Sequence, residues 1–544
     1  MFSETTTSSP APPARRFSLG WQYFALFVII VLVAGIRLRL RDFPLERDEG
    51  EYAYAGQLIL QGIPPYQLAY NMKLPGTYAA YAAILAVFGQ TPAAIHIGIA
   101  LVNAASIFLV FLLVRRLFDP LAAVVSAATF GLFTIRPLLF GLAGHATHFV
   151  TLFFLLSLFV LLRAQETRKL SAFFVSGLLS GCALLMKQPG AFLALFVALY
   201  LCWEGWQQHR ARRAIMQSAI AFSAGTILPY LLTCVILWRA GVFPKFWFWT
   251  VSYARAYGSE LTLSEGLTQF ANRMVLQKEN MLLVWLFIVF GMAAFLWDRS
   301  VRPRAVFLLG LLACSFFALS VGFYYRGHYF ILLYPALAML AGIGVSSAYR
   351  LLERHSGKAL IATAAPILFT VAFAAAVYAD RKIYFVDSPL EACREIYGTN
   401  PFPETLVVAD YIKAHSTPRD RIAVIGSEPQ IYFYAQRRSV TGYIYTYPLV
   451  EEQQYGSRMQ REMIQEVESA KPEFLVYVLR PESWLTRPGA DQHIFDWAGD
   501  YTRRNYDLVG IADGGNHDIY RWGPEAATYR PRRPAVVLVY RRAS

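Results

Sequence analysis

The sequence predicts a polytopic α-helical membrane protein that ends in a smaller α/β domain. Of its 544 residues, 56% are hydrophobic and only 16% are charged, whereas a soluble domain is about 25% charged. Apolar runs fill the chain as far as Tyr378, and after Asp380 short apolar strands alternate with polar helical stretches. Arginines and lysines cluster between the apolar runs, so the net charge of +14 indicates membrane orientation and not a nucleic-acid partner.

A membrane span needs about 20 apolar residues. We expect spans at 17–40, 92–117, 121–135, 148–162, 170–186, 190–203, 215–238, 281–297, 305–322, 330–349 and 359–378, and about 11–13 transmembrane helices in all. Several runs are short, so neighbouring helices must shield their ends. Residues 79–88 are apolar but too short to cross alone, which predicts an interfacial or re-entrant helix.

Basic residues orient these spans. With a cytoplasmic N-terminus, the loops that fall inside hold the arginines and lysines of 115–116, 163–169, 209–213, 299–304 and 350–358, as the positive-inside rule requires. We therefore expect a multi-pass protein of the inner (plasma) membrane. Its parts are a polar cytoplasmic tail at 1–16, a transmembrane domain at 17–379 with functional outer loops at 41–90 and 240–280, and an extracytoplasmic α/β domain at 380–544.

The C-terminal domain is predicted from its short strands. Residues 421–425 and 474–479 have the pattern of buried strands, 508–511 and 519–522 that of a closing pair, and 451–470 that of a polar helix. Residues 425–429 lack the glycines of a phosphate-binding fingerprint. The five cysteines have no spacing that indicates a metal or a disulfide framework.

The first outside loop carries the strongest functional candidates. Asp48, Glu49 and Glu51 begin a helical stretch beside a span, where acidic residues are costly unless they are paired or functional. At 3.6 residues per turn, Asp48, Glu51 and Tyr52 share one face, and Glu49 points about 100° away. The alternative is a capped interfacial helix with solvated acids.

The outside loops also gather cations, namely Lys73, Lys187, Arg255 and Arg326. Lys187 lies between two apolar runs on the side where a basic residue does not help orientation, although a snorkelling lysine is the alternative. Four cations on one face of the membrane indicate a site for an anionic head group. Phosphate suits them, because lysine offers a point charge and arginine a planar fork.

Taken together, these segments resemble the GT-C superfamily of glycosyltransferases, and most closely its bacterial members related to lipid A aminoarabinose transferase and to protein O-mannosyltransferases. The resemblance covers the membrane half and is carried by Asp48-Glu49, the lysine-containing segment 70–75, Met-Lys-Gln-Pro at 186–189, and His328 ahead of 334–338. These families use a polyprenyl-phosphate sugar as donor. The resemblance implies transfer of that sugar, with inversion, to a lipid, glycan or protein acceptor at the outer membrane face.

The resemblance also implies roles for individual residues. It makes Asp48 the catalytic base, with Glu49 beside it, and assigns the donor phosphate to Lys73, Lys187, Arg255, Arg326 and His328. The expected substrate-lining residues are Tyr52, Tyr70, Tyr253 and Tyr325. Related enzymes often carry an acid in the second outside loop, where this chain has His145, Thr147 and His148. No cofactor is fixed by this pattern: a divalent metal held by His145 and His148 stays open beside a packing role for both.

Two other functions stay open at this point, an oligosaccharide ligase on the same scaffold and a transporter or flippase of a lipid-linked sugar. Ionisable residues lie at the ends of the spans and there is no internal repeat, which favours the enzyme. Residues 243–257 are rich in aromatics and are followed by a helix-compatible run to Asn280. This segment predicts either an interfacial aromatic belt or a lid over the site.

Overall fold

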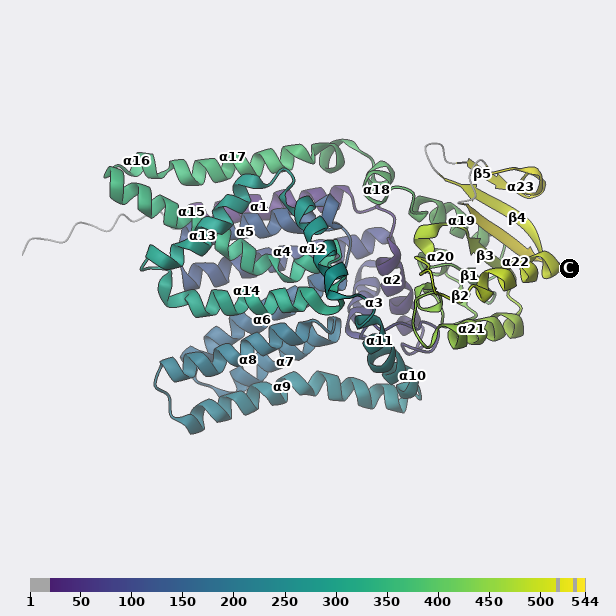
Figure 1. Cartoon of the computed structure of the whole chain (residues 1–544), viewed down its shortest axis with the longest axis horizontal. Helices are drawn as coiled ribbons and strands as arrows, with labels where there is room; N and C mark the ends of the chain where they lie inside the picture. The colour runs from purple at the N-terminus through teal and green to yellow at the C-terminus, as the bar shows by residue number, and fades with distance from the viewer. Residues whose placement is uncertain (1–19, 515–518, 532–535, 544) are drawn as a thin grey trace, which may run out of the picture.

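The computed structural model describes residues 20–514, 519–531 and 536–543. Figure 1 shows a bundle of long helices at one end of the molecule and a sheet with its own helices at the other. Helices α2 (Arg47–Leu60) and α3 (Gly76–Phe88) lie between the two parts. The expected fold class, a polytopic helical membrane protein with a C-terminal α/β domain, is confirmed. The tail expected at 1–16 lies outside the described residues.

Eight helical segments in the described residues are long and apolar enough to cross a membrane. They are α1 (Trp21–Arg39), α4 (Pro92–Leu117), α6 (Ala146–Thr167), α8 (Gly190–Gln207), α9 (Arg212–Arg239), α14 (Ala305–Ser320) with its flanking turns, α15 (Tyr334–Ser356), and α16 (Ala359–Ala362) continued by α17 (Ala364–Ala379).

Three further apolar helices are shorter, namely α5 (Pro120–Ile135), α7 (Leu170–Met186) and α13 (Leu282–Trp297). Helix α13 is bent by 111° from α12 (Leu263–Lys278), and this pair makes at most a ninth span. All eleven expected runs are helical in the described part of the chain. By length and composition the described residues therefore offer eight spans, or nine with the bent pair, beside the 11–13 expected, and the difference lies in these three helices of 16 or 17 residues.

Small residues let the helices of the bundle pack closely. A Cβ atom on Gly177 of α7 would lie 1.9 Å from the carbonyl oxygen of Phe222 on α9, and one on Gly342 of α15 would lie 2.2 Å from Ser126 Oγ on α5. Such glycines are typical of helix interfaces in membranes. On the outer surface, Phe24 of α1 and Trp238 of α9 are both 69% exposed, as lipid-facing side chains are.

Between α9 and α13, residues 242–280 form the outer segment, which runs along the end of the bundle. It consists of α10 (Phe243–Trp247), a π-helical turn (Phe248–Tyr253), α11 (Ala254–Gly258) and α12. Lys245 forms an ion pair with Glu462, and Arg487 lies 3.4 Å from Glu260, so two ion pairs join this segment to the C-terminal domain. Single 3₁₀ turns occur at Pro137–Leu139, Arg302–Arg304, Val321–Phe323 and Gly327–Leu332.

The C-terminal domain is built on one mixed sheet with the strand order β2-β1-β3-β6-β4-β5. Strand β1 pairs in parallel with β2 and β3, and the remaining pairs are antiparallel. The strands are β1 (Arg421–Ile425), β2 (Arg438–Ser439), β3 (Phe474–Val478), β4 (Tyr506–Asp513), β5 (Ile519–Trp522) and β6 (Val537–Arg542). The four expected strands are confirmed. Strands β2 and β6 were not expected, and β6 lies at the centre of the sheet.

Helices cover this sheet and connect it to the bundle. They are α18 (Pro389–Tyr397), α19 (Phe402–Ala414), α20 (Gln430–Ala435), α21 (Gly456–Ala470), α22 (His493–Asn505) and α23 (Pro524–Thr528). A π-helical turn (Lys382–Val386) follows α17, and 3₁₀ turns occur at Tyr447–Leu449 and Pro481–Ser483.

Helix α2 is fixed between the bundle and the C-terminal domain. Its N-cap is Glu46, which leaves Asp48 in the first turn. Arg47 donates to Glu428 of the C-terminal domain at 2.7 Å, and both side chains are buried. A Cβ atom on Gly50 would lie 2.7 Å from the backbone nitrogen of Gln430. Only glycine permits this approach, so the start of α2 lies directly against α20.

Candidate active site

A cavity of about 180 Å³ lies where α2, the outer segment and the C-terminal domain meet. Its charged lining residues are Asp48, Lys73, Lys187, Arg326 and Glu451, and its tyrosines are Tyr52, Tyr253, Tyr257, Tyr329, Tyr445 and Tyr447. The cavity thus brings residues of the first outside loop, such as Asp48 and Lys73, together with residues of the C-terminal domain, such as Glu451.

Asp48 is buried at the edge of this cavity, and its two carboxylate oxygens have different neighbours. Oδ1 accepts hydrogen bonds from Lys73 Nζ at 2.7 Å and from the Tyr445 hydroxyl at 3.0 Å. Oδ2 faces His145 Nδ1 and His328 Nε2, each at 3.8 Å. Burial alone would raise the pKa of Asp48, but Lys73 and the two histidines outweigh it and hold that pKa well below its ordinary value.

Lys73 is shared between two carboxylates. Its Nζ lies 2.7 Å from Asp48 and 2.7 Å from Glu51. Glu51 is fully buried and also accepts hydrogen bonds from Tyr78 at 2.5 Å and Asn71 at 2.8 Å. Although burial lowers the pKa of Lys73, the two carboxylates raise it overall. One lysine therefore compensates the charge of two acids.

Lys187 and Arg326 are different, because neither has an ion pair among the described residues. Lys187 follows α7, and its Nζ lies 3.7 Å from the centre of the Tyr329 ring. Burial and the nearby charges of Lys73 and Arg326 lower its pKa to about 7, although Asp48 acts in the opposite direction. Arg326 donates to the Tyr257 hydroxyl at 3.2 Å. Both cations line the cavity and are available to an anionic ligand.

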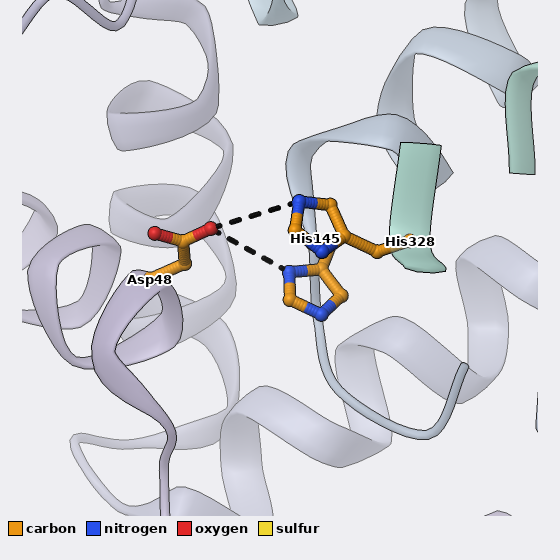
Figure 2. Close-up of side chains that lie close together, drawn as sticks. All are labelled: Asp48, His145 and His328. Atoms are coloured by element: carbon orange, nitrogen blue, oxygen red, sulfur yellow. Dashed lines mark ion pairs between the residues drawn. The ribbon is translucent and has the colours of Figure 1, made fainter. Parts of the chain in front are cut away.

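Figure 2 shows Asp48 on α2 facing two histidines, His145 ahead of α6 and His328 on the turn before α15. The imidazole rings stack with their centres 3.8 Å apart. One ligand atom from each of the three residues lies within 4.8 Å of the others. Neither ring nitrogen of His145, nor Nδ1 of His328, has a hydrogen-bond partner in the described chain. Burial lowers the pKa of both histidines, that of His145 to about 4, so each keeps a lone pair for a metal ion at neutral pH.

His148 is not part of this group. It lies one turn inside α6, and its Nε2 is 3.3 Å from the carbonyl oxygen of Gly141. The structure therefore does not bring His145 and His148 together as a pair of metal ligands. The second histidine of the group with Asp48 is instead His328, which the resemblance had assigned to the donor phosphate.

Four other expected residues do not line the cavity. Glu49 is fully buried, accepts a hydrogen bond from Gly144 N at 2.5 Å and lies 3.1 Å from His96. Tyr70 stacks on Trp249, and Tyr325 donates to Ser320. Arg255 is exposed. It lies two residues from Tyr253, which is about 200° around a helix, so it points away when Tyr253 faces the cavity.

The C-terminal domain supplies lining residues that the sequence reasoning missed, namely Tyr445, Tyr447 and Glu451. Tyr445 touches Asp48 across 397 residues of sequence. The only local signal was the alternation of tyrosines at 443, 445 and 447 in an otherwise polar domain.

Comparison with known proteins agrees with the resemblance of the membrane half. A family model described as dolichyl-phosphate-mannose-protein mannosyltransferase matches residues 73–238. The lipopolysaccharide core galacturonosyltransferase RgtB of Rhizobium johnstonii is 31% identical over 191 residues, which are 34% of this chain and 37% of that protein. This relative is therefore matched over little more than a third of its length.

Solved structures match over nearly the whole chain. ArnT from Cupriavidus metallidurans bound to undecaprenyl phosphate is 16% identical with a TM-score of 0.57, and the match covers 96% of this chain and 98% of ArnT. The apo oligosaccharyltransferase of Archaeoglobus fulgidus is 13% identical with a TM-score of 0.54, covering 94% of this chain and 75% of that one. These likenesses confirm the expected GT-C fold of a multi-span membrane protein, including the C-terminal domain.

Proposed function

We propose that this chain is a glycosyltransferase that moves a sugar from a polyprenyl-phosphate donor to a lipid, glycan or protein acceptor at the outer membrane face. The observation that carries the proposal is the pair of cations, Lys187 and Arg326, which share a cavity with Asp48 and lack an acidic partner among the described residues. Charges this enclosed are costly without a counterion. A lipid phosphate supplies one. The cavity is lined from α2, the outer segment and the C-terminal domain, and Figure 1 shows these elements at one end of the helix bundle.

The same residues support a mechanism. The Asp48 carboxylate takes the proton of the acceptor hydroxyl while the hydroxyl oxygen attacks the anomeric carbon, with inversion in a single displacement. Lys187 and Arg326 stabilise the charge that develops on the departing phosphate. Lys73 can turn towards the phosphate and keep Glu51 as a partner, which frees the Asp48 carboxylate when the donor is bound. Glu49 does not touch the cavity, so we assign it the role of positioning the loop at Gly144.

The geometry favours a small glycosyl group. A cavity of about 180 Å³ is smaller than the roughly 300–1,000 Å³ of drug-sized ligand sites. It suits one sugar ring better than an oligosaccharide, which supports a monosaccharide transferase over an oligosaccharide ligase.

We also propose the division and orientation of the chain that its charges predict. The N-terminal tail at 1–16 is cytoplasmic, the transmembrane domain spans 17–379, and the domain at 380–544 lies outside the plasma membrane. The C-terminal end of α15 and the turn before α16, which hold the basic residues of 350–358, are at the end of the bundle opposite the sheet. This placement supports a basic cytoplasmic end and an outer cavity.

Asp48, His145 and His328 fit a divalent metal as a further component of this site. The unpartnered imidazole nitrogens supply the lone pairs and Asp48 Oδ2 the anionic ligand. When bound, the ion would add a positive charge beside the phosphate. Elemental analysis of protein incubated with Zn²⁺ or Mn²⁺ tests this. His145→Ala and His328→Ala should lose the ion and His148→Ala should keep it, and equal retention by all three would contradict the site.

Binding of polyprenyl phosphate tests the proposed function. Lys187→Ala should weaken binding by about 1.5–3 kcal/mol, the contribution of one charge-assisted contact, and should leave binding of the neutral polyprenol unchanged. Lys382→Ala is the matched control, because this lysine is exposed and pairs with Glu395 away from the cavity. Equal losses for the phosphate and the alcohol would mean that Lys187 only supports packing.

A further inference from the structure

One wall of the cavity takes no part in the transfer described above. Residues 445–451 of the C-terminal domain contribute Tyr445, Tyr447 and Glu451 to the lining. Next to them, the outer segment contributes Tyr253, which donates a hydrogen bond to Glu451, and Tyr257. This wall is therefore made of phenols and one carboxyl group, with no lysine.

Glu451 is the polar centre of this wall. Its Oε2 accepts a hydrogen bond from the Tyr253 hydroxyl, whereas no hydrogen bond to its Oε1 is found in the described chain. Burial raises the pKa of Glu451 to about 7, and the nearby carboxylate of Glu260 acts in the same direction against Arg326 and Arg487. A half-buried acceptor with a free oxygen facing a cavity has the chemistry to receive hydroxyl groups.

The arrangement of charge separates this wall from the phosphate position. Lys187 lies against the Tyr329 ring, with its Nζ 3.7 Å from the ring centre. Arg326 donates to the Tyr257 hydroxyl at 3.2 Å, and the ring centre of Tyr257 is 6.4 Å from that of Tyr253, which donates to Glu451. Arg326 is therefore linked through these two tyrosines to the carboxyl side of the cavity. A phosphate is repelled by Glu451 and attracted to Lys187, so the group attached to the phosphate occupies the Glu451 side.

We propose that Glu451, Tyr253 and the tyrosines at 445 and 447 form the subsite for the glycosyl group of the donor, and that Glu451 is the residue that selects among sugars by accepting their hydroxyls. This inference rests on the proposed function and extends it. Phenol rings offer an apolar face to the sugar ring and a hydroxyl to its substituents. A site built to hydrogen-bond a substrate hydroxyl rejects an analogue that lacks it far more strongly than an apolar pocket does.

The assignment to the donor, and not to the acceptor, follows from covalent reach. The anomeric carbon is joined to the phosphate through one oxygen, so a phosphate between Lys187 and Arg326 leaves the sugar ring inside the same small cavity. Tyr253 belongs to the outer segment and Glu451 to the C-terminal domain, so their hydrogen bond closes the cavity over that ring.

Binding of defined lipids to the full-length protein in detergent tests the subsite. The probes are undecaprenyl phosphate and its esters with a neutral hexose, a hexuronic acid and an amino sugar. Wild type should bind at least one ester more tightly than the bare phosphate. Glu451→Gln should weaken binding of that ester by at least about tenfold, the range for a hydrogen bond to a charged group. Its affinity for the bare phosphate should stay within about twofold of the wild-type value. Glu452→Gln, an exposed neighbour, is the matched control.

The outcomes separate this inference from the proposed function. If wild type binds no polyprenyl phosphate at all, the proposed function fails. If it binds the bare phosphate and every ester equally, or if Glu451→Gln weakens bare and glycosylated lipids alike, the phosphate site stands and the sugar subsite is refuted. An unchanged donor affinity with a raised KM for the acceptor would assign Glu451 to the acceptor and overturn the proposal.

Discussion

Replacing Asp48 by asparagine should separate catalysis from stability. Asparagine keeps the size of the side chain and an oxygen that can accept from Tyr445, and Lys73 keeps Glu51 at 2.7 Å. The substitution therefore removes no cation's last acidic partner, so we expect the protein to stay folded and to bind polyprenyl phosphate. A positioned base contributes about 10²–10⁴ in rate, which is about 3–5 kcal/mol of activation free energy. The transfer rate should fall by that factor.

Glu49→Gln should give the opposite pattern. Glu49 is fully buried, and its carboxylate binds Gly144 N at 2.5 Å and faces His96 at 3.1 Å. Loss of the charge weakens two contacts that hold the loop next to His145, at a cost of about 1.5–3 kcal/mol each for hydrogen bonds to a charged group. We expect a lower unfolding temperature and a smaller loss of transfer than in Asp48→Asn.

Two measurements on each variant decide between these expectations. Mass spectrometry compares the glycolipids and glycans of a strain that lacks the protein with those of the same strain carrying wild type, Asp48→Asn or Glu49→Gln. Unfolding of the purified proteins is followed by tryptophan fluorescence. If Asp48→Asn restores the missing glycan and the stable, folded Glu49→Gln does not, the base is Glu49 and the reasoning from cavity geometry is refuted.

Three further predictions follow from the same geometry. Hydrogen exchange of the outer segment, Phe246 to Asn280, should slow when donor lipid binds, and equal exchange in both states would favour a fixed aromatic belt. Because the pKa of free Lys187 is about 7, its charge is lost as the pH rises above that value. The affinity of wild type for polyprenyl phosphate should therefore fall relative to Lys187→Arg, and parallel pH profiles would contradict this. Arg47→Ala leaves Glu428 buried without its partner and should destabilise the protein by about 3–5 kcal/mol, measured by thermal unfolding against the exposed-site variant Arg41→Ala.

The sequence allowed the fold and part of the site to be predicted, because these depend on local patterns. Asp48 and Tyr52 were placed on one helical face by their spacing, and both line the cavity. Lys187 was singled out because it interrupts two apolar runs, and it is one of the two cations in the cavity lining that have no acidic partner among the described residues. Hydrophobic runs located all eleven helical segments, of which eight, or nine with the bent pair, have the length and composition of a span in the described residues.

The rest of the site depends on contacts that sequence spacing does not encode. His145 and His328 stack although 183 positions separate them, and Tyr445 reaches Asp48 from another domain. Arg255 was expected at the phosphate from its aromatic surroundings, but helical phase turns it outward while Tyr253 and Tyr257, four residues apart, both line the cavity. In the same way, the pairing of Lys73 with Glu51 depends on the fold of the loop at 70–75.

The position of α2 between the two parts of the molecule has a consequence for the order in which the protein matures. Arg47 and Asp48 are made early, whereas their partners Glu428 and Tyr445 emerge 381 and 397 residues later. At a synthesis rate of about 5–20 residues per second, that delay is roughly 20–80 s. During this interval Arg47 lacks Glu428 and Asp48 lacks Tyr445, although Lys73 is already present as a partner for Asp48 and Glu51. The cavity is therefore completed only when the C-terminal domain has docked, and under the proposed function we expect no transfer by a nascent or truncated chain before that step.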